Sequence, residues 1–139
     1  NITLRGGQRN REHPTVVCDF DFGFLCGMYA AEGYVSANKN TTFAASDSVT
    51  RKYLADVIAK IFHKVYVKNN HKNYIGFCDA GIAQWFKAHC GHSAQNKRVP
   101  DFMFGAPEEC RRGFVAGFWL GDGRVHDKNG VPSDTDACI

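Results

Sequence analysis

The stretch GFLCGMYAAEGYV (residues 23–35) decides the fold, because a second version of it, GFVAGFWLGDGRV, occupies residues 113–125. The two copies share the pattern G-F-x-x-G-x-x-x-x-acid-G-x-V, and the second begins 90 residues after the first. A repeat of this kind can determine a whole architecture. Each copy predicts a helix that ends on an acid, although a helix C-terminus disfavours negative charge by about 0.3–1 kcal/mol. An acid placed against this rule indicates a functional site.

Small residues recur at a spacing of four in both copies. Gly27 and Ala31 share one face of the first predicted helix, and Gly117 and Gly121 share one face of the second. Small side chains on one face allow two helix backbones to approach closely. We therefore expect the two helices to pack side by side and parallel.

Parallel packing would bring the carboxylates of Glu32 and Asp122 to the same end of the helix pair. Two carboxylates at close range repel, and one would normally take up a proton. A divalent cation removes the repulsion and reverses that pKa argument. Carboxylate oxygens suit Mg²⁺ or Mn²⁺, and Mg²⁺ takes its remaining ligands from water and phosphate. One such helix alone would be read as an ordinary packed helix, whereas two copies favour a metal site.

The rest of the chain alternates helix and strand signals. Asp19 or Asp21 caps the first predicted helix, and Gly33 ends it. The predicted order is a helix over 20–32, strands within 34–46, a helix over 49–62, a hairpin over 64–77, a helix over 79–91, a connector and a helix beginning at Pro107, with a strand-like segment after each copy of the repeat. This order predicts an α+β fold with helices on one face of an antiparallel sheet.

The composition is typical of a soluble globular protein. Of the 139 residues, 44% are hydrophobic and 22% are charged, and the net charge of +3 permits a nucleic-acid partner without requiring one. No apolar run is long enough to cross a bilayer and no secretory signal is visible, so we expect an intracellular protein with reduced cysteines and no membrane partner. The alternative is a zinc site formed by HCGH (residues 89–92) with Cys78, but its spacing fits no standard finger.

The paired repeat resembles the LAGLIDADG homing endonucleases. Residues 25–33 and 115–123 fill the motif positions once each. The segment NKRVP (residues 96–100) is similar to the Lys-x-[Ile/Val]-Pro block that precedes the second motif in endonucleases embedded in inteins. The resemblance covers about residues 20–125. It implies an αββαββα half-domain with an antiparallel sheet, followed by the first helix of a second, truncated half.

The resemblance also implies site-specific cleavage of both strands of DNA. In that family the sheets straddle the DNA and the motif acids bind divalent metal between two scissile phosphates. Glu32 and Asp122 match the catalytic, metal-binding acids, and Lys97 matches the lysine that polarises the attacking water or the phosphate. These roles fit metal-assisted hydrolysis with Mg²⁺ or Mn²⁺. Lys97 has an alternative interpretation as one more solvated base beside Arg98.

Contact with double-stranded DNA is expected from the exposed face of the sheet and its turns. Basic groups there position phosphates, and amide or hydroxyl groups read bases. Without the repeat, a solvated sheet edge protected by lysine would be the simpler interpretation. An N-terminal arm with three arginines either tracks phosphates or is disordered. The candidate DNA-binding residues are Ser36, Asn38, Lys39, Asn40 and Thr42 in the first hairpin and Lys64, Tyr66, Lys68, Asn70, His71 and Lys72 in the second.

The chain divides into four expected segments: a basic arm or linker (1–19), a first LAGLIDADG half-domain (20–95), a connector (96–110) and the start of an incomplete second half (111–139). A second chain or a host protein would supply the remainder, or the molecule has lost cleavage. Inteins begin with Cys or Ser and end with His-Asn, whereas this sequence begins with Asn1 and ends with Ile139, so we expect an internal piece or one fragment of a split intein, of microbial or phage origin. The alternatives to a nuclease are a non-cleaving split-intein fragment or maturase-like nucleic-acid binder, and a globular module with no nucleic-acid role.

Overall fold

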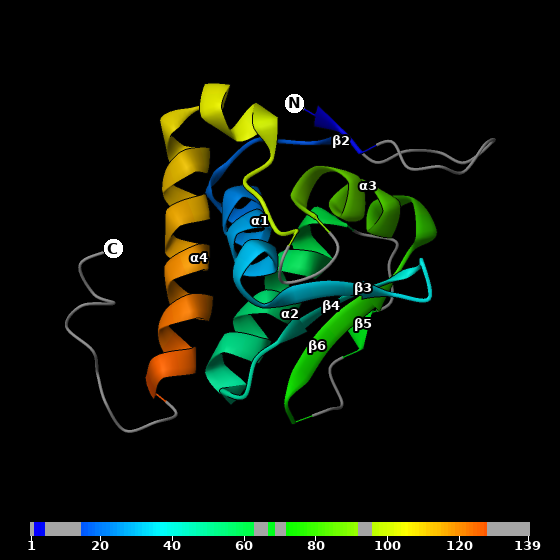
Figure 1. Cartoon of the computed structure of the whole chain (residues 1–139), viewed down its shortest axis with the longest axis vertical. Coiled ribbons are helices and arrows are strands. Elements are labelled where there is room, and N and C mark those ends of the chain that lie inside the picture. The colour runs from blue at the N-terminus through cyan, green and yellow to red at the C-terminus, as the bar shows by residue number, and fades with distance from the viewer. Residues whose placement is uncertain (1, 5–14, 63–66, 69–71, 92–95, 128–139) are drawn as a thin grey trace.

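The computed structural model describes residues 2–4, 15–62, 67–68, 72–91 and 96–127 (Figure 1). The elements of these residues are β1 (Ile2–Thr3), β2 (Thr15–Val16), α1 (Phe20–Glu32), β3 (Gly33–Ser36), β4 (Asn40–Ala44), α2 (Ser48–Ile61), β5 (Val67–Lys68), β6 (Tyr74–Cys78), α3 (Ala80–Cys90), the short 3-10 helix η1 (Asp101–Gly105) and α4 (Glu108–Asp127). From α1 to α3 the order is αββαββα, so the predicted α+β class is confirmed.

Aspartates fix the starts of the three helices that pack on the sheet. Asp19, Asp47 and Asp79 each stand directly before a helix, and each side chain accepts a hydrogen bond from the backbone N–H three residues further on, at 2.9–3.0 Å. Such bonds satisfy N–H groups that have no partner inside the helix. The predicted bounds of α1, residues 20–32, match the structure because this cap and Gly33 delimit it.

The central sheet has the antiparallel strand order β3-β4-β6-β5. Its first hairpin turns at Ala37 and Asn38, whose φ angles of 52° and 55° are those of a tight turn that matches the strand twist. The Lys39 N–H closes the turn by donating to the Ser36 carbonyl at 3.2 Å. The predicted turn is therefore confirmed. In the second hairpin, residues 64–66 and the predicted turn residues 69–71 lie outside the described part of the chain.

The sheet has one covered face. Val35, Phe43 and Ile75 are buried against the helices. The residues that precede them in their strands are exposed or half-buried: Tyr34, Thr42 and Tyr74. The three helices α1, α2 and α3 all contact this sheet, whereas α4 packs along α1 at the outside of the molecule (Figure 1). Apolar alternation along the strands thus separates a core face from an open face.

The end of α4 differs from the sequence-based expectation. The repeat predicted a helix ending at Gly123 with a strand-like segment after it, but α4 continues through residues 123–127 to Asp127. In the first copy the chain can leave the helix at Gly33 because β3 pairs immediately with β4. No strand in the described part of the chain pairs with residues 123–127, and a helix satisfies its own backbone hydrogen bonds. The prediction that this helix ends on Asp122 was therefore wrong, and residues 128–139, where most of the expected strand-like segment would lie, are outside the described part of the chain.

Candidate functional site

The helices α1 and α4 contact each other through glycines that are related by the repeat. A Cβ atom at Gly27 would overlap the carbonyl oxygen of Phe114, and a Cβ at Gly117 would overlap that of Phe24. Because Phe114 stands 90 residues after Phe24, as Gly117 does after Gly27, the two contacts are reciprocal. Gly23 and Gly113 repeat this arrangement one turn earlier, with the carbonyls of Cys110 and Phe20. The two helices therefore run parallel and in backbone contact, and a local two-fold axis relates them.

This packing brings both motif acids to one end of the pair. A Cβ at Gly121 would lie 2.7 Å from the Cβ of Ala31 and 3.2 Å from the Cγ of Glu32. Asp122 is the next residue of α4, and both acids are half-buried. Glu32 is the last residue of α1, whereas Asp122 lies inside α4. The candidate metal-binding acids thus come from adjacent turns of two touching helices.

The donor set at this end fits a hard cation that keeps water ligands. Within the described ranges, no group of three or more His, Cys, Asp or Glu side chains is arranged to hold a metal ion. Two carboxylates without further protein ligands suit Mg²⁺, which usually takes one or two carboxylates and completes its shell with waters and substrate phosphates. The same set would be incomplete for a structural zinc ion, which takes four protein ligands.

Lys97 lies at the same end of α1. Its Nζ donates a hydrogen bond of 2.7 Å to the carbonyl oxygen of Tyr29 and lies 4.8 Å from the centroid of the Tyr29 ring. Burial lowers the pKa of Lys97, and the nearby Glu32 carboxylate opposes this shift. Arg98, the neighbouring base, instead binds the carbonyls of Ala88 and His89 at the end of α3. The half-buried Lys97 therefore differs from a freely solvated surface base.

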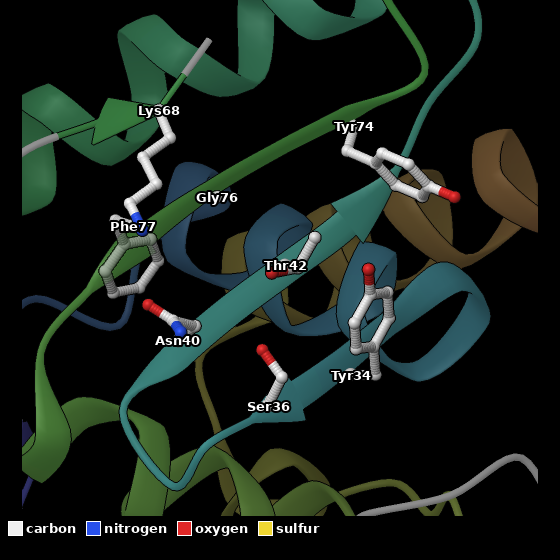
Figure 2. Close-up of a pocket in the computed structure, with 8 residues that line it drawn as sticks. All are labelled: Tyr34, Ser36, Asn40, Thr42, Lys68, Tyr74, Gly76 and Phe77. Atoms are coloured by element: carbon white, nitrogen blue, oxygen red, sulfur yellow. The ribbon is translucent and has the colours of Figure 1, made fainter. Parts of the chain in front are cut away.

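The open face of the sheet forms a groove (Figure 2). Strand alternation places side chains from β3, β4, β5 and β6 along it. Of the candidate DNA-binding residues, Ser36, Asn40, Thr42 and Lys68 line this groove together. Sequence reasoning missed Tyr34, Tyr74 and Gly76, which line it too, although period-two alternation could have assigned Tyr34 to the face of Ser36.

The other candidate DNA-binding residues are placed less fully. Asn38 and Lys39 lie exposed in the first hairpin turn, where the Asn38 side chain accepts a bond of 3.1 Å from Lys87 Nζ. Lys72 is exposed just before β6. Lys64, Tyr66, Asn70 and His71, and the arginines of the N-terminal arm, lie outside the described residues.

The alternative zinc ligands are not brought together. Cys78 is exposed before α3 and Cys90 is buried at its end, and a helix of 11 residues separates its ends by about 16 Å. His89 is exposed with its ring 4.8 Å from that of Trp85, and His92 lies outside the described residues. Cys18, Cys26, Cys78, Cys90 and Cys110 are all free thiols.

Each helix in the described part of the chain is too short or too polar to cross a membrane.

The chain is similar to short regions of much longer proteins, among them a DNA polymerase and a DNA helicase. It is 32% identical over 130 residues to a DNA polymerase of Thermococcus sp. (strain GE8), matching 90% of this chain and 8% of that protein. It is 29% identical over 138 residues to the ATP-dependent DNA helicase Hel308 of Thermococcus kodakarensis, matching 89% of this chain and 12% of that protein.

A third relative is a subunit of an RNA polymerase. The chain is 29% identical over 116 residues to the DNA-directed RNA polymerase subunit Rpo1C of Methanocaldococcus jannaschii, which matches 78% of this chain and 13% of that protein. No family model matches the chain. The chain therefore spans about an eighth or less of the length of these three relatives, and what it shares with each of them is one short segment.

Proposed function

We propose that the chain is a metal-dependent, site-specific double-strand DNA endonuclease of the LAGLIDADG type, carried as an intein-associated element inside longer proteins. The observation that carries the proposal is the reciprocal glycine packing of α1 and α4, which brings Glu32 against the turn that holds Asp122. The paired motif requires two parallel helices that bring their acids to one point, which α1 does at its last residue and α4 does five residues before its end. A helix pair serving only the core would have no need of acids at its half-buried end.

The names of the relatives support an inserted element. A DNA polymerase, a DNA helicase and an RNA polymerase subunit carry out different reactions, yet each shares with this chain a segment amounting to 8–13% of its own length. A segment common to such different proteins has a function separate from theirs. An element that inserts itself into coding sequences, and acts on DNA to do so, accounts for this distribution.

The open face of the sheet supports DNA as the substrate. Its groove combines one lysine, Lys68, with the amide of Asn40 and the hydroxyl of Thr42. A cation can neutralise a phosphate, whereas amides and hydroxyls can read base edges in the major groove. Because β3 begins at Gly33, directly after Glu32, a duplex lying along this face would pass close to the acids.

The acids and the lysine of the site have different tasks in phosphodiester hydrolysis. Glu32 and Asp122 would hold Mg²⁺ or Mn²⁺, which when bound supplies positive charge to the phosphate and lowers the pKa of a water molecule. Lys97 donates hydrogen bonds, and its ammonium can stabilise charge that develops on a phosphate oxygen. Tyr29 and the connector hold this ammonium on the protein side of the site.

The cleavage experiment uses a plasmid in which the coding sequences on either side of this segment are joined without it. We expect linear product with Mg²⁺ and none in EDTA. Glu32→Gln and Asp122→Asn should each lower the cleavage rate by about 100-fold or more, because each removes a charged metal ligand. Both variants should still bind the same DNA in EDTA.

The matched control for this experiment is Asp56→Asn. Asp56 is an exposed acid on α2 whose ion pair with Lys52 is long, at 3.9 Å. This variant removes the same charge away from the site and should cut like the unaltered chain. Cleavage that persists in both Glu32→Gln and Asp122→Asn would refute the proposed nuclease.

One observation favours a second candidate, a non-cleaving DNA-binding fragment of a split intein. The outward face of α4 exposes Val115 and Trp119, with exposed fractions of 64% and 43%. Their counterparts in the first copy, Leu25 and Tyr29, are fully buried under the sheet. A second sheet supplied by another chain or a host protein would cover this face. Metal-independent binding of the plasmid site without any cleavage product would favour this candidate.

A further inference from the structure

Tyr29, in the turn of α1 that precedes Glu32, is held by α3, by β4 and by the residue that follows α3. Its ring is fully buried and stacks on Phe86 of α3 at a centroid distance of 5.0 Å. It meets the edge of Phe43 of β4 at 6.3 Å. Its hydroxyl donates a hydrogen bond of 2.8 Å to the carbonyl oxygen of Gly91, directly after α3. The orientation of this ring is therefore set by the tertiary structure and not by α1 alone.

Lys97 contacts Tyr29 in two ways. Its Nζ donates to the Tyr29 carbonyl oxygen at 2.7 Å, and the same atom lies 4.8 Å from the ring centroid. A cation within about 6 Å of an aromatic centroid is attracted by the electrons of the ring face. The carbonyl also accepts the N–H of Gly33, so the ammonium adds a second bond to an oxygen in the last turn of the helix. One residue thus fixes the end of a long, flexible side chain.

The connector on both sides of Lys97 is fixed as well. The Arg98 N–H donates to the Cys90 carbonyl at 3.0 Å, and the Arg98 guanidinium binds carbonyls of the same helix end. Gly91 has a φ angle of 89°, and a Cβ there would overlap the carbonyl oxygen of Asn96. Glycine therefore lets the connector fold back over the end of α3. The backbone delivers Lys97 to the site, and Tyr29 completes the placement.

We propose that Tyr29 is a positioning residue for Lys97: its ring and carbonyl oxygen hold the lysine ammonium at the Glu32 end of α1, where a phosphate would be bound. Without these contacts the lysine side chain would sample many rotamers. The proposal rests on the proposed function for what the ammonium does, whereas the placement itself can be tested without DNA or metal.

The placement is tested by NMR on the metal-free chain with ¹³C-labelled lysine. The Tyr29 ring current should shift the Lys97 methylene signals upfield, and Lys97→Arg identifies them by their loss. Tyr29→Phe keeps the ring and should keep the shift, whereas Tyr29→Leu should return the signals to ordinary values. Phe43→Leu is the matched control, because it removes a buried ring that contacts Tyr29 from the side of β4. It should leave the Lys97 shift in place.

The positioning role is tested by cleavage in the same variants. Tyr29→Leu should slow cleavage by about 10-fold or more, since small misplacements of a reacting group are costly. Tyr29→Phe should restore most of the rate. In a Lys97→Met background, Tyr29→Leu should cause no further loss, because the group that it positions is already gone.

Each outcome decides the proposal. An unshifted Lys97 signal in the unaltered chain, or equal losses from Tyr29→Leu with and without Lys97, would overturn it. If Tyr29→Leu fails to fold, the spectra of the unaltered chain and of Tyr29→Phe still decide the placement. A shifted Lys97 signal in a chain that cuts no DNA would refute the nuclease and support the placement.

Discussion

At the residue scale, Gly33 joins the acid end of the helix pair to the open sheet face. It follows α1 with φ −95° and ψ 158°, an extended conformation and not the left-handed one usual for glycine after a helix. Glycine is needed for space, because a Cβ would lie 2.6 Å from the Cα of Tyr29. The chain therefore passes from Glu32 to Tyr34 on the groove without an intervening loop.

The cysteines give a residue-scale prediction. Burial, aided by Cys18 and acidic neighbours, raises the pKa of Cys110 to about 11, whereas Cys78 is exposed on β6. A raised thiol pKa leaves less thiolate at pH 8, so iodoacetamide should alkylate Cys110 about 100-fold more slowly than Cys78. Peptide mapping by mass spectrometry measures both rates in one sample. Equal rates in the folded chain would contradict the burial of Cys110, and unfolding in guanidinium should make the rates similar.

At the element scale, α1 and α4 meet backbone to backbone at four glycines, whereas Gly121 faces side chains of α1. The facing positions Gly23, Gly27, Gly113 and Gly117 each meet a carbonyl of the partner helix. Close approach of this kind allows dispersion contacts along the whole seam but tolerates no added atom. The seam is therefore sensitive to small increases in side-chain volume.

Gly27→Ala tests this seam. Alanine favours a helix interior by about 0.5–1 kcal/mol, but its methyl group would overlap the Phe114 carbonyl. Overpacking costs about 1–3 kcal/mol, so we expect a net loss in the free energy of unfolding in urea. Gly117→Ala should cost a similar amount, because its contact with Phe24 is the reciprocal one. The control is Gly105→Ala, where a Cβ would meet no atom within 4 Å. Equal stability of Gly27→Ala and Gly105→Ala would contradict the close seam.

Local signals in the sequence account for most of the elements. Asp19 and Gly33 predict the bounds of α1, and the alternation of helix and strand signals predicts the order of elements from α1 to α3. The prediction failed at Gly123, because whether a chain leaves a helix there depends on a partner strand elsewhere. The paired acids follow from the repeat alone. The contact of Lys97 with Tyr29 could not be predicted, since 68 residues separate the two and no local pattern records it.

At the scale of the whole molecule, the two faces of the sheet have different roles: one packs in the hydrophobic core and the other lines the groove. One face carries Phe43 and Ile75 into the core under three helices, and the other carries Thr42 and Lys68 into the groove (Figure 2). Because successive side chains of a strand point to opposite faces, residues on the open face can be substituted without disturbing the core. The proposed DNA contacts can therefore vary while the fold is kept.

The groove gives a prediction at this scale. Lys68→Glu reverses a charge on the open face, and Lys52→Glu makes the same change on α2, where the lysine side chain is 81% exposed. In EDTA, Lys68→Glu should weaken DNA binding by about 10-fold at low salt and lower the slope of log affinity against log salt by about 1, since one phosphate contact is lost. Lys52→Glu should have a smaller effect. Fluorescence anisotropy with a labelled duplex measures both, and equal losses would place the contact elsewhere.

The reciprocal glycine contacts carry a consequence for ancestry. Since Gly23, Gly27, Gly113 and Gly117 face main-chain atoms of the neighbouring helix, these four positions require a small residue at a fixed interval. Any helix with that spacing, whether from a duplicated gene or another polypeptide, meets the requirement without redesign of the hydrophobic interior. Such a contact allows one partner helix to replace another. Fusion, splitting and exchange of the two half-domains are therefore possible during evolution of this protein.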